Sequence, residues 1–103
     1  KDLIKDLNSK IEVLDKGQTL YLFGAHIFSQ YLIGFGLNTN RLECIIDNDT
    51  MKQGKRLYGT DFKVFTPRVL KEKNPVVILK AGVYNDEIKK DILTNINSKT
   101  IFL

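Results

Sequence analysis

A strand of the buried type, a glycine turn and a helical segment follow one another in TLYLFGAHIFSQYLIGF, residues 19–35. The mostly apolar run Thr19–Phe23 is typical of a strand that is covered on both faces, and Gly24-Ala25 turns the chain out of it. From about Ile27 to Phe35, apolar residues recur at helical spacing. This unit predicts the start of a βαβ arrangement, in which a helix connects two parallel strands.

The same alternation continues along the rest of the chain. Further strands are expected at 42–46, 75–79 and 100–103, and further helices at 1–16, 67–73 and 85–96. The segment between the second strand and residue 65 has no helical period, so we expect an ordered loop there, with residues 62–65 as a candidate short edge strand. Because βαβ units build parallel sheets with right-handed crossovers, we predict an α/β, Rossmann-like domain. It has about four parallel strands in the order 2-1-3-4, with helices on both faces.

Length and composition restrict the class of protein. A chain of 103 residues is enough for one domain with a real core, so residues 1–103 are expected to form a single domain. The net charge of +4 is spread evenly, which does not favour nucleic acid as a partner, and no apolar run is long enough to cross a membrane. The single cysteine, Cys44, rules out a disulfide within the chain and fits a cytoplasmic location.

The carboxyl ends of the strands are the expected place for a ligand. In an open parallel sheet, ligands bind beyond these ends, where the strand order reverses. Here that edge is formed by Gly24-Ala25-His26, by Asp47-Asn48-Asp49 and by Lys80-Ala81-Gly82.

A dinucleotide site is the first candidate at this edge. Asp47 follows Gly24 by 23 positions, which is the spacing of an acidic residue that binds a ribose hydroxyl. The glycine fingerprint is absent, however, because His26 and Ser29 stand where it needs glycines. His26 is read either as a phosphate-contacting or proton-transferring group, or as a half-exposed polar cap of the helix. No catalytic set and no metal site can be assembled from the remaining residues.

A longer stretch carries a more specific pattern. Asp47 closes the second strand and is followed by Lys52-Gln53-Gly54, then by Gly59-Thr60. Together with Gly24-Ala25 upstream and the stretch that begins at Tyr84 downstream, this resembles the C-terminal domain of sugar C-methyltransferases. Those enzymes use S-adenosylmethionine to methylate a carbon of a nucleotide-linked deoxysugar. The similarity covers about residues 19–96, and the chain departs from the family pattern at Phe28-Ser29-Gln30, where members carry Lys-Gly-Asn.

The resemblance implies a role for each matched residue. The domain would be a non-catalytic, C-terminal piece of a longer enzyme that binds the nucleotide-sugar, while S-adenosylmethionine binds the preceding domain, which would be its partner. The diphosphate is expected at Gly24-Ala25-His26, where free backbone N–H groups and the helix dipole favour an anion. Asp47 would meet a ribose or sugar hydroxyl, and Lys52 would close over the charge from a loop that Gly54 shapes. Tyr84 completes the expected substrate-binding set.

Two other readings stay open at this point. One is a nucleotide-sugar-binding or regulatory Rossmann-like domain of another polysaccharide-biosynthesis enzyme, such as a sugar acetyltransferase. The other is a protein-interaction domain without a small ligand, which an exposed Phe28 would favour.

Overall fold

The computed structural model of the protein describes residues 2–72 and 74–103. Within them, five parallel strands form one sheet in the order β3-β2-β1-β4-β5. The strands are β1 (Thr19–Phe23), β2 (Leu42–Ile46), β3 (Val64–Phe65), β4 (Pro75–Ile78) and β5 (Ile101–Phe102). The predicted order of the four main strands is confirmed. The sheet has five strands because the candidate edge strand forms, as β3, and pairs with β2.

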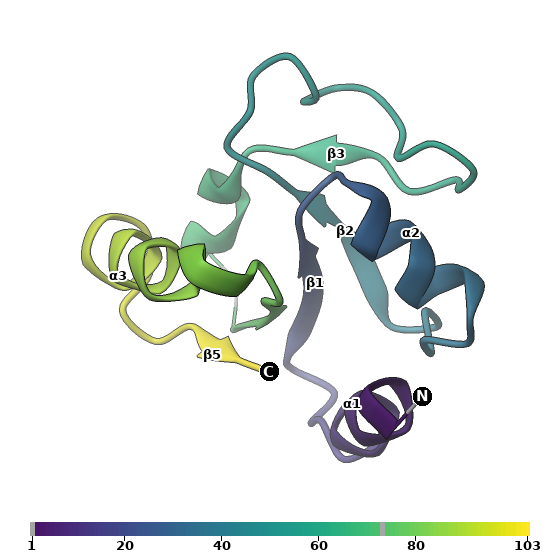
Figure 1. Cartoon of the computed structure of the whole chain (residues 1–103). Helices are drawn as coiled ribbons and strands as arrows, with labels where there is room; N and C mark the ends of the chain where they lie inside the picture. The colour runs from purple at the N-terminus through teal and green to yellow at the C-terminus, as the bar shows by residue number, and fades with distance from the viewer. Residues whose placement is uncertain (1, 73) are drawn as a thin grey trace.

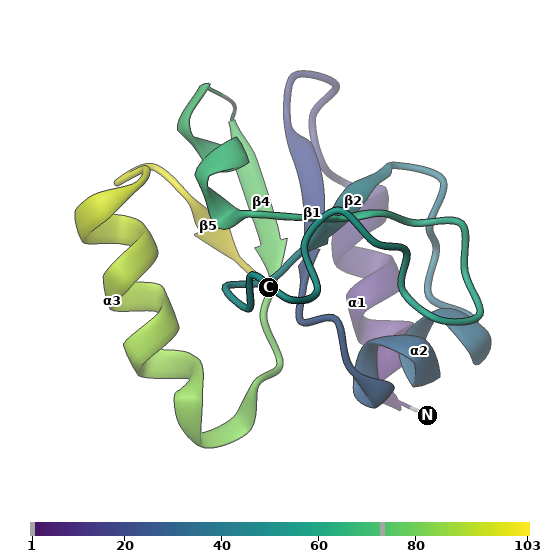
Figure 2. The same ribbon diagram turned by 90° about the horizontal axis from the view of Figure 1, so that it is seen from above.

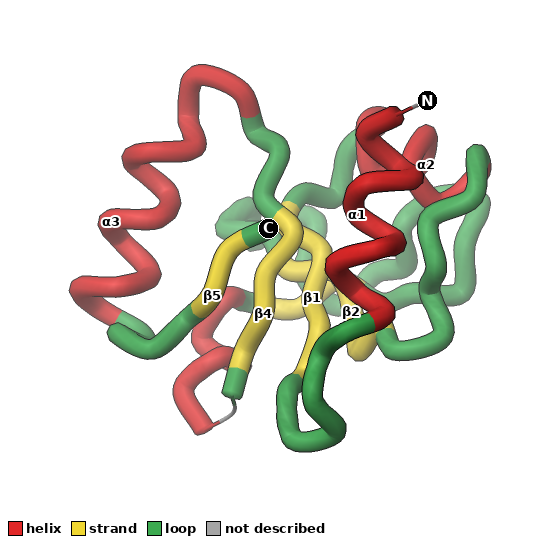
Figure 3. Tube along the Cα trace, turned by 90° about the horizontal axis from the view of Figure 1, so that it is seen from below, coloured by secondary structure: helices red, strands yellow, loops and turns green. Residues whose placement is uncertain are grey.

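Helices cover both faces of the sheet, as predicted. The helices α1 (Asp2–Glu12) and α2 (Ile27–Gly34) lie on one side. The helix α3 (Asn85–Asn95) and the 3₁₀ helix η1 (Pro67–Glu72) lie on the other (Figures 1 and 2). A second, short 3₁₀ turn, η2 (Gly82–Tyr84), leads directly into α3. Figure 3 shows β5, β4, β1 and β2 side by side between α3 and α1.

The core has two halves because the sheet is buried on both faces. Along β1, Leu20 and Leu22 pack into the cluster beneath α1 and α2, whereas Tyr21 and Phe23 pack into the cluster on the α3 side. This explains why β1 reads as an apolar run and not as an alternating one. On the inner face predicted for the last helix, Ile92 is fully buried. Ile88 and Ile96, one turn away on either side, are partly buried and pack against the same cluster.

One irregularity interrupts the pairing of the two central strands. Leu20 is opposite Leu42, but Tyr21 is opposite Cys44, so Glu43 is an extra residue on β2. A bulge of this kind reverses the alternation of side chains beyond it. As a result, Cys44 lies on the same face as Tyr21 while the Glu43 side chain is exposed.

Two helix predictions need correction. The helix expected over 1–16 ends at Glu12, and the following segment turns toward β1 with its Leu14, Asp15 and Gln18 carbonyls bound by the Arg41 guanidinium. The helix expected over 67–73 is 3₁₀ in its described part, and its final residue, 73, lies outside the described residues. The expected N-cap, Thr66, forms, but its hydrogen bond is long, with 3.4 Å between the Arg68 backbone nitrogen and the Thr66 hydroxyl oxygen. The connection from β3 to β4 runs from residue 66 to 74, which is shorter than the dozen or more residues of a usual helical crossover.

Candidate functional site

The first turn, Gly24–His26, begins where β1 ends. Gly24 has a φ of 110°, a backbone conformation that only glycine adopts readily. The His26 ring folds back over it, so a Cβ at position 24 would overlap the ring, with its Cδ2 atom at 2.7 Å. Position 24 therefore requires glycine for two reasons, its backbone angle and the imidazole above it.

The backbone N–H groups of this turn are largely occupied. The Gly24 N–H donates to the Ile46 carbonyl at 2.8 Å, and the Ala25 N–H donates to Asp47 Oδ2 at 2.8 Å. The expectation of free N–H groups at these two residues was therefore wrong, because the neighbouring strand β2 supplies their acceptors. What stays available is the N-terminus of α2, where His26 makes no side-chain cap and the first turn holds no acidic residue.

Asp47 joins three parts of the structure. Besides accepting from Ala25, its carboxylate accepts the Asp49 N–H at 2.8 Å through Oδ1. Its own N–H donates to the Phe65 carbonyl of β3, and its carbonyl accepts the Gln53 side-chain amide at 2.8 Å. Asp47 thus fixes the first turn, the end of the sheet and the following loop relative to one another.

The 47–63 loop owes its shape to its two glycines. Gly54 and Gly59, with φ of 85° and 80°, each occupy the third position of a four-residue turn. These turns are closed by hydrogen bonds from the Lys55 N–H to the Lys52 carbonyl and from the Thr60 N–H to the Leu57 carbonyl. A positive φ at the third position that follows a negative φ at the second is typical of a type II turn, so the backbone requires the glycines of the Gln-Gly and Tyr-Gly pairs.

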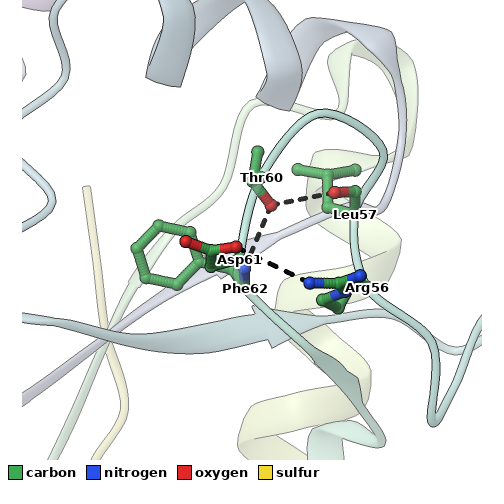
Figure 4. Close-up of polar contacts among 5 residues, drawn as sticks. All are labelled: Arg56, Leu57, Thr60, Asp61 and Phe62. Carbon is green, nitrogen blue, oxygen red and sulfur yellow. Dashed lines mark hydrogen bonds and ion pairs between the residues drawn. The ribbon is translucent and has the colours of Figure 1, made fainter.

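The far end of the loop folds back as a hairpin onto the residues before β3. The Leu57 N–H donates to the Phe62 carbonyl at 2.8 Å. The Thr60 hydroxyl donates to the Leu57 carbonyl and accepts the Phe62 N–H, and Arg56 pairs with Asp61 at 3.6 Å (Figure 4). The loop is consequently ordered, and in Figure 1 it arches beside β3 at the edge of the sheet.

The remaining predicted residues, Lys52 and Tyr84, follow β2 and β4, and among the described residues neither makes a direct hydrogen bond to the first turn. Lys52 is half-buried, and no ion pair involves it within the part of the chain that the structure describes. Tyr84 follows β4 on the other side of the point where the strand order reverses, and its side chain is 62% exposed. In that turn, Gly82 has a φ of 63° and the Ala81 N–H donates to the Asn85 side chain.

Sequence reasoning missed the anchoring role of Gln53 and the double acceptor role of Asp47. It also missed two surface hollows that arise from packing. One of about 610 Å³ lies between α1 and α2, and one of about 510 Å³ lies on the opposite face near β2 and β3. No local sequence signal indicates either hollow.

Two kinds of feature are absent from residues 2–72 and 74–103. No group of three or more His, Cys, Asp or Glu is placed to hold a metal ion. None of the helices there combines the length and apolar character that crossing a bilayer demands.

The fold and this edge define a small Rossmann-like domain with an ordered loop over the carboxyl ends of its strands. Comparison with protein families identifies it further: the family described as the C-methyltransferase C-terminal domain matches residues 2–102. The chain belongs to this family. Comparisons with the curated proteins and with the solved structures gave no significant match.

Proposed function

We propose that this domain binds the nucleotide-linked sugar substrate of a C-methyltransferase at the carboxyl edge of its sheet. In this proposal, the methyl transfer uses groups outside the chain, and S-adenosylmethionine binds the preceding domain of the parent enzyme. We further infer a cytoplasmic setting, because the free thiol of Cys44 is preserved in a reducing compartment. The family membership supports the enzyme class.

One observation carries the proposal: the hydrogen bonds of Asp47 hold the first turn and the loop that contains Lys52 at one edge of the sheet. The N-terminus of α2 has no acidic residue in its first turn and no side-chain cap, so its partial positive charge is not neutralised locally. Lys52 lies in a loop that Asp47 and Gln53 anchor to the end of β2, close to the first turn along the sheet edge. A helix N-terminus and an unpaired ammonium group favour a diphosphate.

The hydrogen bonds of Asp47 refine its proposed role. Each carboxylate oxygen already accepts one backbone N–H, and each keeps a second lone pair. A ribose or sugar hydroxyl could donate to that lone pair without displacing either bond. Gly24, Ala25 and Gly54 then shape the site through their backbone, while His26 and Tyr84 offer side chains from its two sides.

A neutral variant of Lys52 tests the proposal by titration calorimetry with UDP-glucose as the probe. Lys52→Ala should weaken binding by about 1–2 kcal/mol, because it removes a charge-assisted hydrogen bond to phosphate. Lys16→Ala is the matched control, since Lys16 is an exposed lysine in the turn before β1, at the opposite edge of the sheet. Equal affinities of the two variants would contradict the proposed site.

A second candidate function is a protein contact at the same edge. Phe28 was expected to be exposed and so to favour such a contact, but it is partly buried and its ring stacks on that of Tyr31, with the ring centroids 5.8 Å apart. Other side chains there are apolar and exposed, with Ile27 at 80% and Val83 at 90%. We propose that these exposed apolar side chains contact the preceding domain of the parent enzyme, which would form the other wall of the site. That domain is therefore the proposed protein partner.

A further inference from the structure

The second face of the sheet is incompletely covered next to β3. The connection from β3 to β4, residues 66–74, contains η1, which contributes Leu70 to the core and Val69 to its margin. Figure 2 shows α3 on the β5 side of this face, away from β2. The uncovered part contains the hollow of about 510 Å³, between β1, β2, the residues before β3 and η1.

Apolar side chains form most of the walls of this hollow. Phe62, Phe65 and Val69 line it. The Phe62 side chain packs against the cluster beneath α1 and α2, so the apolar side chains on this face are those of Val69 and of Phe65, which is 42% exposed although it belongs to a strand. Charges of both signs also line the hollow, from Glu43, Asp61 and Lys63. An apolar hollow with a mixed rim favours a ligand without net charge.

The floor carries one polar group that the protein leaves unused. Tyr21 is only 1% exposed and lines the hollow, and none of the hydrogen bonds among the described residues involves its hydroxyl. No fully buried side-chain polar atom of those residues lacks a partner, so the hydroxyl oxygen keeps some contact with solvent, and the hollow is a surface space that Tyr21 lines. The bulge at Glu43 sets Cys44 beside it on the same face. Burial raises the pKa of Tyr21 to about 12, so its O–H remains available as a donor at ordinary pH.

We propose that this hollow is a second binding site, for a small uncharged aromatic ligand that carries a carbonyl group. The ring packs against the side chains of Phe65 and Val69, and the carbonyl oxygen accepts a hydrogen bond from the Tyr21 hydroxyl. The site lies on a face of the sheet, apart from the carboxyl edge, and is independent of the nucleotide-sugar proposal.

Two probes of nearly the same shape test this site by chemical-shift titration. Acetophenone has a ring and a carbonyl oxygen, and ethylbenzene has the same ring without the acceptor. Both should shift the amides around Tyr21, Cys44 and Val69 in the wild-type chain. Tyr21→Phe should weaken acetophenone about fivefold and leave ethylbenzene unchanged, because it removes one hydrogen bond and little volume. Tyr31→Phe, which removes a hydroxyl on the opposite side of the sheet, should change neither.

A second variant checks the apolar wall. Phe65→Ala removes a partly exposed ring and should weaken both probes to a similar extent. Urea unfolding of each variant establishes that the fold is kept. Shifts that fall mainly on α1 and α2, no shifts at millimolar probe, or an equal loss of both probes in Tyr21→Phe would each overturn the proposal.

Discussion

At the end of β2, the Asp47 carboxylate accepts hydrogen bonds from two backbone N–H groups that belong to different turns. The spacing from Gly24 predicted a hydroxyl-binding acid at this position. The same spacing also suits an acid that closes the first turn, and only the location of the Ala25 N–H distinguishes the two roles. That location depends on how β1 and β2 pair, which residues 22 positions apart do not reveal locally.

Replacing Asp47 tests its architectural role. Asp47→Ala leaves the N–H of half-buried Ala25 without an acceptor and should lower the free energy of unfolding by about 1–3 kcal/mol, measured by urea denaturation. Asp61→Ala is the matched control, because the Asp61 side chain is fully exposed and pairs with Arg56 only at 3.6 Å. No measurable change is expected there. An Asp47 variant as stable as the Asp61 variant would show that its hydrogen bonds contribute nothing to the fold.

The buried pair Tyr21 and Cys44 predicts a loss of stability at alkaline pH. Burial first, and the neighbouring Glu43 second, raise the pKa of Cys44 to about 12 from its ordinary 9.0. Burial, then Cys44 and Glu43, raise the pKa of Tyr21 to about 12 from 10.0. Between pH 9 and 12 the unfolded chain therefore loses these protons before the folded chain does, and the free energy of unfolding falls as pH rises.

Urea midpoints at pH 8, 10 and 11 measure this loss. Cys44→Val removes one of the two groups, so its midpoint should fall less steeply with pH than that of the wild type. The comparison of slopes cancels the contribution of the lysines, which both proteins share. Parallel slopes would mean that the Cys44 thiol titrates alike in the folded and unfolded states.

At the scale of the elements, the 47–63 loop shows what a family pattern encodes. Lys52-Gln53-Gly54 and Gly59-Thr60 were the residues on which the resemblance to sugar C-methyltransferases depended. In the structure, both glycines close type II turns and Gln53 anchors the loop to Asp47. Of these residues, Lys52 is the one whose side chain is left for a ligand.

Alanine substitutions distinguish the turn glycines from glycines elsewhere. Gly54→Ala and Gly59→Ala should each cost about 1–2 kcal/mol, because a Cβ disfavours their positive φ even though no atom crowds it. Gly34→Ala, in α2 and with open space around it, should instead stabilise the domain by about 0.5–1 kcal/mol. Thermal or urea unfolding of the three variants checks the sign. A stabilising change at Gly54 would contradict the assigned turn.

Element boundaries were less predictable than element order. The first helix was predicted to extend beyond Glu12 because Leu14 continues the apolar spacing of residues 1–16. In the structure, Leu14 packs on the core from a turn instead of a helix. The segment after Thr66-Pro67 has a helix start, but it forms a 3₁₀ helix within a connection shorter than a usual helical crossover. Both errors arise because tertiary contacts override local propensity at the ends of elements.

On the scale of the whole molecule, the alternation of strands and helices determined the parallel sheet and its order. The carboxyl edge could be located for the same reason, since topology alone decides where it lies. The occupied N–H groups of the first turn and the hollow that Tyr21 lines could not be predicted. They depend on register, on the bulge at Glu43 and on the shortness of η1, which only the packed structure makes visible.

Chemical-shift mapping with UDP-glucose tests directly whether the carboxyl edge of the sheet binds the nucleotide-sugar, because it reports on the backbone amides of the whole domain at once. We expect shifts at the N-terminus of α2, around Lys52 and at Tyr84, with S-adenosylmethionine as a control ligand that leaves these amides unchanged. Affinity should be weak, because the proposed preceding domain would supply the other wall of the site. No shifts at millimolar UDP-glucose, or shifts confined to α1 at residues 2–12, would contradict the claim that this edge holds the nucleotide-sugar.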